Sequence, residues 1–294
     1  MQRGAAILLA LCLLWGACSA ASPAATSQGA TTTTVAPTTV PAGPTTTVDT
    51  SGVAPSGLRT RKAGVLIVGT ERVIPPWFIG PTPDLVSGGF EYDVAAELAR
   101  RLGVPAVQVK PTSLVLMMGG EDCGCDLMIS GITITDARAR TLDLSEPYLT
   151  ADQGVLVRKA TTITTPASAA ALRWAIALRN ASGLDLLQSS IKPTIEPMVL
   201  VNEDDAVQQL AQGHVDAVLM DTPAALAIAN AKPEFAVIGQ YKTGEQYSMA
   251  LSLGTPNTPI INDTIRDMRD DGTIDMLMRA YFGIDPAKLP TLSS

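Results

Sequence analysis

The stretch AVQQLAQGHVDAVLMDTP, residues 206–223, carries three elements of one fold pattern. Apolar residues recur at helical spacing over residues 206–211, and Gly213 follows where a helix C-cap is expected. The apolar run Ala217–Met220 predicts a buried strand. Thr222–Pro223 then opens a further helix, with a hydroxyl at the N-cap and proline at the first helical position. This order of helix, strand and helix is typical of α/β proteins with mainly parallel sheets.

The same alternation extends towards both ends of the chain. Val65–Val68 predicts a strand, and apolar residues spaced four apart over residues 90–102 predict an amphipathic helix. Further strands are predicted at residues 107–109 and 127–130. We expect the folded part to begin near Ala63, and its length suits two lobes of ~100 residues each.

Composition excludes two classes of protein. The chain has 294 residues, with 21 Lys and Arg against 28 Asp and Glu, and a net charge of -7. This acidic balance argues against a nucleic-acid binder that works through a basic surface. The longest apolar run, Ala5–Trp15, is well short of the ~20 residues that span a bilayer, so no permanent transmembrane helix is expected.

The N-terminus has the layout of a secretory signal peptide, residues 1–18. Arg3 precedes the apolar run and small residues follow it. Gly16–Cys18 also resembles the lipobox of bacterial lipoproteins, so Cys18 is a candidate lipidation site that would anchor the protein to the outer face of the cytoplasmic membrane. The alternative is cleavage near Ala17 or Ala20, which would leave the protein periplasmic or secreted.

Residues 19–62 form an expected linker. Residues 19–48 are Ala, Ser, Thr, Pro, Gly or Val with the exception of Gln28, and they carry no charge. Such a composition has too little large apolar surface to offset the entropy of ordering. We therefore predict a disordered tether rich in Ala, Thr, Pro and Ser.

Two cysteines remain in the predicted folded part, Cys123 and Cys125. Residues two apart on a strand hold their Cβ atoms too far apart for an unstrained disulfide, so a bond would require a turn at Gly124. A strained or absent bond is expected. The chain has one histidine, His214, so we expect no metal site, and the sequence calls for no cofactor.

Several stretches together resemble a known family, the amino-acid-binding bacterial extracellular solute-binding proteins, family 3. They occur in the family's order between about Val65 and Gly283. The stretches are Gly89–Val94, Asp126–Arg138, Leu144–Tyr148, Gly213–Val218, and Asp271–Thr273 with Tyr281–Gly283.

The resemblance implies a fold, namely a two-lobed α/β clamshell of the type II periplasmic-binding-protein kind, with mainly parallel sheets and a two-strand hinge. Lobe 1 would comprise residues 63–154 and 250–294, and lobe 2 residues 155–249. The hinge crossings are expected near Val155–Lys159 and Gln246–Ala250.

The resemblance also implies how the ligand is held. An amino acid carries a carboxylate and an ammonium group. The carboxylate is best bound by an arginine guanidinium, whose N–H groups donate two parallel hydrogen bonds, and the ammonium group by a fixed carboxylate. In the family's pattern Arg138 binds the α-carboxylate, and the Thr133 hydroxyl, beside Gly131, donates a further hydrogen bond. Asp221 binds the α-ammonium group. Without that pattern, Arg138 would be read as a solvated surface charge and Asp221 as a helix cap.

The side-chain end of the predicted pocket departs from the family. Relatives usually have an aromatic ring that stacks over the ligand, and here the corresponding position, near Ser113, has none. Relatives also have an aromatic residue after the first strand, and Trp77 is the candidate for it. The second-lobe loop contributes Arg179, Asn180 and Ser182 as candidates.

Two of these candidates give conflicting indications about the ligand. Arg179 favours an acidic ligand unless it points to solvent, whereas Glu71 favours one that donates hydrogen bonds. The sequence therefore does not name the amino acid.

The resemblance predicts binding of a small polar amino acid, or a close analogue, for uptake through an ABC permease. It predicts no catalysis. One alternative is a sensory or scaffolding lipoprotein whose cleft has drifted. Another is an enzyme like the cyclohexadienyl dehydratases, for which Glu71 is the acid that we can nominate.

Overall fold

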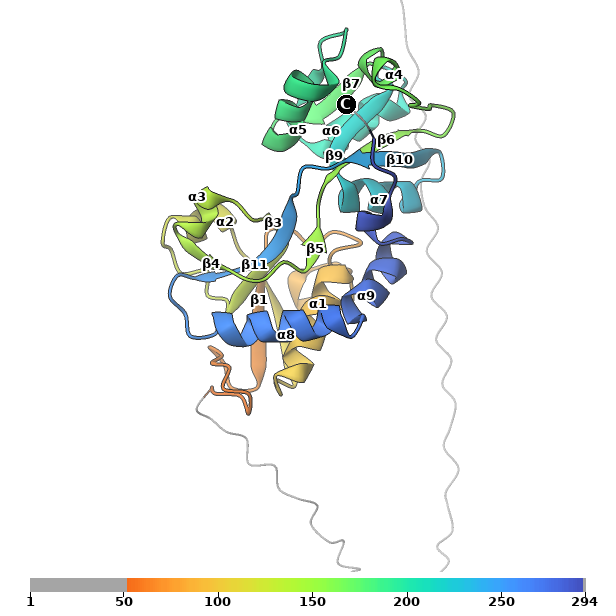
Figure 1. Ribbon diagram of the computed structural model, residues 1–294. Coiled ribbons are helices and arrows are strands. Elements are labelled where there is room, and N and C mark those ends of the chain that lie inside the picture. The colour runs from red at the N-terminus through yellow and green to blue at the C-terminus, as the bar shows by residue number, and fades with distance from the viewer. Residues whose placement is uncertain (1–51, 293–294) are drawn as a thin grey trace, which may run out of the picture. The chain divides into compact units, whose positions relative to one another are not determined.

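The computed structural model describes residues 52–292, which belong to one compact unit. The predicted signal peptide, Cys18 and most of the linker lie outside the described residues. The described chain forms two lobes, each built around its own mixed β-sheet with helices against it (Figure 1). The predicted two-lobed α/β fold is thus confirmed.

The first lobe contains a sheet in the order β2-β1-β3-β11-β4, with β5 also paired to β11. β1 runs parallel to both β2 and β3, whereas β11 is antiparallel to β3, β4 and β5. The strands are β1 (Val65–Thr70), β2 (Ala106–Pro111), β3 (Leu127–Thr133), β4 (Leu142–Leu144), β5 (Leu149–Thr150) and β11 (Gln246–Ser252).

The helices of this lobe enclose its core. The buried residues of β1 and β3 pack with those of the three longest helices into one cluster that includes Phe90, Leu98 and Ile265. The predicted helix over residues 90–102 is confirmed as α1. The helical elements are η1 (Pro83–Leu85), α1 (Phe90–Arg101), α2 (Leu114–Met118), α3 (Asp136–Ala139), α8 (Thr258–Asp270) and α9 (Thr273–Phe282).

The second lobe contains a sheet in the order β10-β6-β9-β7-β8. β7 runs parallel to both β8 and β9, and β6 is antiparallel to β9 and β10. The strands are β6 (Gln153–Arg158), β7 (Trp174–Ala177), β8 (Met198–Leu200), β9 (Ala217–Asp221) and β10 (Phe235–Tyr241).

Two helices of the second lobe, α6 and α7, are the ones that the sequence pattern of residues 206–223 predicts. α6 begins after Asn202, whose side chain caps it, and α7 follows β9 with a proline in its first turn. The helical elements are α4 (Pro166–Ala170), α5 (Ala181–Leu186), η2 (Leu187–Ile191), α6 (Glu203–Ala211) and α7 (Thr222–Ala231).

The chain passes between the two sheets through short segments. Residues 151–152 connect β5 to β6, and residues 242–245 connect β10 to β11. β6 pairs wholly within the second sheet and β11 wholly within the first. The crossings therefore lie a few residues earlier in the chain than the predicted segments 155–159 and 246–250, which fall within these strands.

The C-terminal end returns to the second lobe, which the sequence-based lobe boundaries did not anticipate. After α9 the chain forms η3 (Pro286–Lys288), and the Gln240 side-chain amide donates to the carbonyl oxygen of Pro286 at 2.8 Å. The backbone of Gln240 also bonds to Pro290 and Leu292. Residues 286–292 thus lie against β10, although the sequence assigns them to the first lobe.

Candidate functional site

The predicted ligand-binding residues lie at the carboxyl ends of parallel strands in both lobes. In the first lobe, Glu71 follows β1, and Gly131 and Thr133 end β3. In the second lobe, residues 179–182 follow β7, and Asp221 ends β9. The carboxyl ends of parallel strands share one edge of a sheet, and ligands of open α/β sheets bind outside that edge.

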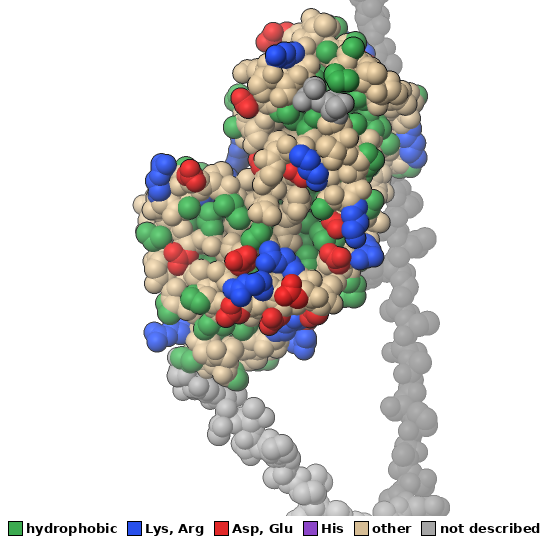
Figure 2. Space-filling model, viewed as in Figure 1, with side chains coloured by type: hydrophobic (Ala, Val, Ile, Leu, Met, Phe, Trp, Pro, Cys, Tyr) green, Lys and Arg blue, Asp and Glu red, His purple; other side chains and the backbone are tan. Residues whose placement is uncertain are grey.

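These two edges act on each other electrostatically. Burial lowers the pKa of Arg138, and among the charges that also shift this pKa are Glu71 of its own lobe and Arg179 and Asp221 of the second lobe. Charges shift one another's pKa only when they are near one another. Arg138 of the first lobe and Asp221 of the second are therefore near enough to act on each other. Figure 2 shows a notch in the molecular surface between the two lobes.

Arg138 is held in place by its own segment. Thr135 caps α3 by accepting the Arg138 backbone N–H, and the guanidinium Nη1 donates to the Thr133 carbonyl oxygen at 2.5 Å. The side chain is half-buried. Among residues 52–292, its other guanidinium N–H groups have no hydrogen-bond partner, so they remain available to a ligand carboxylate.

Asp221 is fixed by two donors rather than by capping a helix. Its Oδ1 accepts from Gln153 Nε2 at 2.8 Å, and its Oδ2 accepts from the Tyr247 hydroxyl. Its side chain makes no capping bond to α7. Burial raises the pKa of Asp221 to about 6, the Glu245 charge adds to this rise, and the Tyr247 and Gln153 hydrogen bonds oppose it. Pairing with an ammonium group would restore the charged carboxylate.

A chain of hydrogen bonds orients Gln153. Asn180 caps α5 through its Oδ1, while its Nδ2 donates to Gln153 Oε1 at 2.7 Å. Gln153 also donates to Glu245 at 2.9 Å, and Ser182 Oγ donates to the same carboxylate at 2.5 Å. The predicted loop residues Asn180 and Ser182 are therefore partners of this polar network.

The remaining predicted residues take different positions. The Gly131 N–H donates to Glu91 at 2.7 Å, and Glu71 accepts from the Leu114 N–H at 3.4 Å. Trp77 is half-buried in the first lobe, with its ring centroid 5.4 Å from that of Phe282.

Sequence reasoning missed several residues of this region. They comprise Arg72 after β1, Gln153 at the start of β6, Glu203 at the start of α6, Glu245 in the second crossing and Tyr247 in β11. The position of Arg72 and Glu203 just beyond strand ends is the signal that could have found them.

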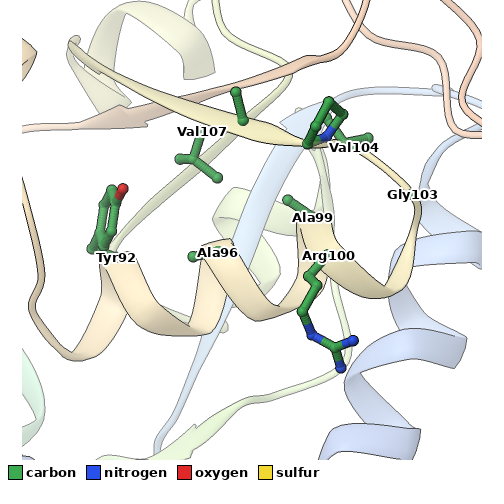
Figure 3. Close-up of a pocket in the computed structure, with 9 residues that line it drawn as sticks. Tyr92, Ala96, Ala99, Arg100, Gly103, Val104 and Val107 are labelled. Atoms are coloured by element: carbon green, nitrogen blue, oxygen red, sulfur yellow. The ribbon is translucent and has the colours of Figure 1, made fainter. Parts of the chain in front are cut away.

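Two pockets of the described chain lie elsewhere. A groove of about 560 Å³ runs along α1 and the start of β2, with Tyr92 and Arg100 among its lining residues (Figure 3). A second pocket of about 360 Å³ lies between α1 and α9. Neither includes a predicted site residue.

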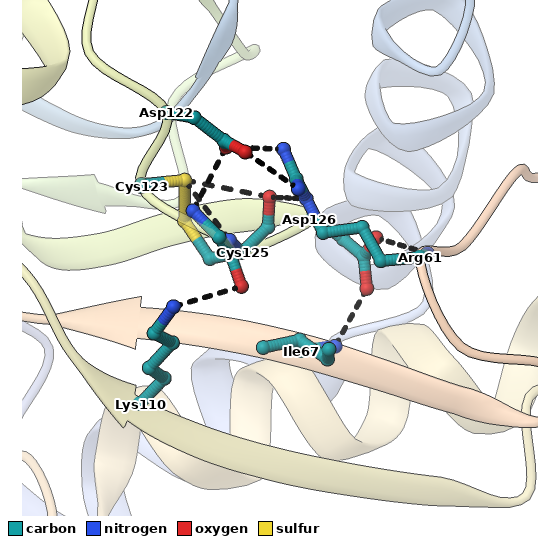
Figure 4. Close-up of a disulfide and its surroundings, with 8 residues drawn as sticks. Arg61, Ile67, Lys110, Asp122, Cys123, Cys125 and Asp126 are labelled. Atoms are coloured by element: carbon teal, nitrogen blue, oxygen red, sulfur yellow. Dashed lines mark hydrogen bonds and ion pairs between the residues drawn. A yellow bond between two sulfur atoms is a disulfide. The ribbon is translucent and has the colours of Figure 1, made fainter.

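Cys123 and Cys125 are joined by a disulfide (Figure 4). The turn that such a bond requires is present, because Gly124 has φ +59°. The Gly124 N–H donates to Asp122 at 2.8 Å, and Arg61 pairs with the same carboxylate. The sequence predicts a strained or absent bond, and the second alternative is wrong because a left-handed glycine brings the two side chains together.

Within residues 52–292, no cluster of three or more His, Cys, Asp and Glu is arranged to hold a metal ion. No helix in that range is both long and apolar enough to cross a bilayer.

Comparison with known proteins connects this geometry to a family. The model of the bacterial extracellular solute-binding proteins, family 3, matches residues 66–284. The L-cystine-binding protein TcyJ of Escherichia coli strain K12 is 31% identical over 245 residues, which cover 78% of this chain and 87% of TcyJ. The glutamine-binding protein GlnH of Bacillus subtilis is 23% identical, covering 68% of this chain and 74% of GlnH.

Solved structures give the same result. An ancestral cationic amino acid solute-binding protein, AncCDT-1, superposes with a TM-score of 0.64 at 30% identity, covering 74% of this chain and 96% of that one. An ancestral arginine-binding protein bound to arginine has a TM-score of 0.58 at 29% identity, covering 75% and 99%.

The two-lobed fold agrees with these matches. The chain belongs to the bacterial extracellular solute-binding proteins, family 3.

Proposed function

We propose that Arg138, Thr133 and Asp221 form the amino-acid-binding end of the site. Arg138 binds the α-carboxylate, Thr133 adds a hydroxyl donor, and Asp221 accepts from the α-ammonium. One observation carries this proposal. Arg138 of the first lobe has guanidinium N–H groups without a hydrogen-bond partner among residues 52–292, and the second lobe holds the half-buried carboxylate of Asp221, whose charge acts on Arg138. The protein binds an amino acid outside the cytoplasm and delivers it to an ABC importer, as its family membership supports.

Ligand binding drives closure of the lobes. A ligand that touches Arg138 and Asp221 together gains both interactions only when the lobes approach, so it shifts the equilibrium towards the closed form. Residues 151–152 and 242–245 are the segments that would change conformation. Burial in the closed form strengthens both ionic contacts because each charge then has its partner.

The protein acts at the outer face of the cytoplasmic membrane, held there by a lipid on Cys18. The lipobox-like sequence before Cys18 supports this localisation. Mass spectrometry of the mature N-terminus tests it. A mature chain that begins at an unmodified residue after Ala17 or Ala20 would contradict anchoring.

The protein works without catalysis. One observation favours a dehydratase-like alternative, because AncCDT-1 is also described as a precursor of cyclohexadienyl dehydratase. The acid nominated for such chemistry, Glu71, is exposed and accepts from a backbone N–H, which is a poor setting for a general acid. Incubation with a cyclohexadienyl acid separates the two functions, and formation of an aromatic product would overturn the proposal.

Thermal-shift titration of the full-length protein with amino acids tests the binding function. A ligand at 100 times its Kd should raise the free energy of unfolding by about 2.7 kcal/mol. Arg138→Ala and Asp221→Ala should each abolish the shift while the free proteins remain folded. Arg140→Ala is the matched control, because Arg140 is exposed at the end of the same helix. Binding that survives in either site variant would refute the assignment.

A further inference from the structure

A second set of charges lies beside the proposed amino-acid-binding end. Arg179 follows β7 and Glu203 follows β8, so both leave the same edge of the second sheet as Asp221. The Leu178 N–H donates to the Leu200 carbonyl oxygen at 2.7 Å, which holds the two loops together beyond the last ladder pair. Arg72 leaves the facing edge of the first lobe, directly after β1.

This second set has no partners of its own. Among residues 52–292, the side chains of Arg72, Arg179 and Glu203 make no hydrogen bond or ion pair, although Glu203 is half-buried. A carboxylate removed from water is costly unless it is paired. Glu203 is thus a half-buried carboxylate without a hydrogen bond from the described residues, and a ligand ammonium group would supply one.

Like charges also act on each other across the two sets. Burial raises the pKa of Glu203 to about 7, and the Asp221 charge adds to the rise, whereas Arg72 and Arg179 oppose it. Arg179 in turn acts on Arg138 as a like charge, after the larger effect of burial. Asp221 and Glu203 are thus two carboxylates that repel each other, and Arg138 and Arg179 are two guanidinium groups that do the same. Arg72, Glu71 and Glu245 are the further charged groups of this region.

We propose that the site binds a bis-amino acid, a molecule with an α-amino-acid group at each end. One end lies between Arg138 and Asp221. The other places its carboxylate against Arg179 or Arg72 and its ammonium against Glu203. This inference rests on the proposed function and specifies its ligand.

Charge matching distinguishes this class from simpler amino acids. A ligand with one ammonium and two carboxylates leaves Glu203 without a cation, and one with an extra cation but a single carboxylate leaves Arg179 without an anion. A bis-amino acid supplies two groups of each sign. Arg179 favours a ligand with an extra carboxylate, whereas the acidic residues favour one with an extra ammonium group. A bis-amino acid has both.

Calorimetric titration of the full-length protein with matched ligands tests the proposal. L-cystine and LL-2,6-diaminopimelate carry two amino-acid ends. S-methyl-L-cysteine carries one end of the former, while L-lysine and L-2-aminopimelate each lack one charged group of the latter. We expect both bis-amino acids to bind at least about tenfold more tightly than their single-ended counterparts.

Two variants locate the second end. Glu203→Gln and Arg179→Gln should each weaken L-cystine binding by about tenfold or more and leave the affinity for S-methyl-L-cysteine within about twofold. Asp204→Asn is the control, since it removes the same charge from an exposed residue in the first turn of the same helix. Circular dichroism of the free variants verifies that they are folded.

The outcomes separate this inference from the proposed function. Single-ended ligands that bind as tightly as the bis-amino acids would overturn the ligand class while leaving amino-acid binding intact. The same holds if Glu203→Gln and Arg179→Gln both leave the L-cystine affinity within twofold. No binding of any amino acid would overturn the proposed function itself, and the ligand class with it.

Discussion

The hydroxyl of Tyr247 donates a hydrogen bond to the carboxylate of Asp221. Tyr247 belongs to β11 of the first sheet and Asp221 ends β9 of the second, so this bond connects the two lobes at the site. Tyr247 is buried, and its ring centroid is 6.2 Å from that of Trp77. The proposed ammonium acceptor is thus oriented by a residue of the opposite lobe.

Tyr247→Phe should weaken amino-acid binding by about tenfold. The substitution removes a donor that lowers the pKa of Asp221, so a larger fraction of that carboxyl becomes protonated and cannot pair with an ammonium group. Calorimetric titration at pH 7 measures the change. Tyr241→Phe is the control, because the Tyr241 hydroxyl is buried without a hydrogen-bond partner in the described structure. Equal affinities in the two variants would contradict this role of Tyr247.

Amino-acid affinity should fall as the pH drops below about 6. Burial raises the pKa of Asp221 to about 6, and protonation there removes the negative charge that pairs with the α-ammonium. The affinity should decrease by up to about tenfold for each pH unit below that value. The groups facing Asp221 are Tyr247, Glu245, Gln153, Arg138 and Glu203.

Titrations between pH 4.5 and pH 8 test this dependence. Asp221→Asn should bind weakly at every pH and show a flatter profile. A wild-type affinity that stays constant from pH 8 to pH 4.5 would show that Asp221 does not hold the ammonium group.

The free energy of unfolding should decrease between about pH 4.5 and pH 7. Burial raises the pKa of Glu91 from its ordinary value of 4.5 to about 7, so the folded state holds this proton more tightly than the unfolded chain. The stabilisation is complete below pH 4.5 and is lost as the pH rises through 7, with a contribution of up to about 3 kcal/mol. Asp221 and Glu203 act in the same direction.

Urea denaturation across this pH range measures the effect. Glu91 accepts from Gly131 N–H and the Tyr148 hydroxyl through a single oxygen, which a glutamine amide oxygen can replace. Glu91→Gln should therefore flatten the profile, while Glu121→Gln, an exposed substitution, should not. An identical slope in Glu91→Gln would argue against a protonated Glu91.

The fold could be predicted because its signals are local. The apolar run Ala217–Met220 and the caps on either side of it determine β9, α6 and α7 with little help from the rest of the chain. The return of residues 286–292 to β10 was missed because it depends on hydrogen bonds that the side chain and backbone of Gln240 make to distant backbone groups. Local sequence patterns do not predict hydrogen bonds between residues so far apart in the chain.

The candidate site was predictable only in part, for a similar reason. Arg138 and Asp221 stand in recognisable motifs, but Gln153 and Tyr247 lie at the beginning of largely buried strands, and no motif distinguishes them there. Their polar groups matter only because the two lobes bring them to Asp221. Glu203 could be placed only once β8 was known to lie beside β7.

Gln240→Leu should lower the free energy of unfolding by about 2 kcal/mol. The side chain is fully buried, its amide donates to the Pro286 carbonyl oxygen, and its oxygen accepts from the Thr222 hydroxyl at 3.1 Å. The substitution leaves these buried partners without one of their hydrogen bonds, which costs about 1–3 kcal/mol. Urea denaturation measures the loss, with Gln212→Leu as the exposed control.

A second variant isolates the contact between β10 and the C-terminal segment. A Cβ at Gly239 would lie 2.8 Å from Leu292 Cγ and 2.9 Å from the Pro290 carbonyl oxygen. Gly239→Ala should therefore displace residues 290–292 and expose them to hydrogen exchange. Unchanged exchange at Leu292, whose N–H donates to the Gln240 carbonyl oxygen, would contradict the docking of this segment on the second lobe.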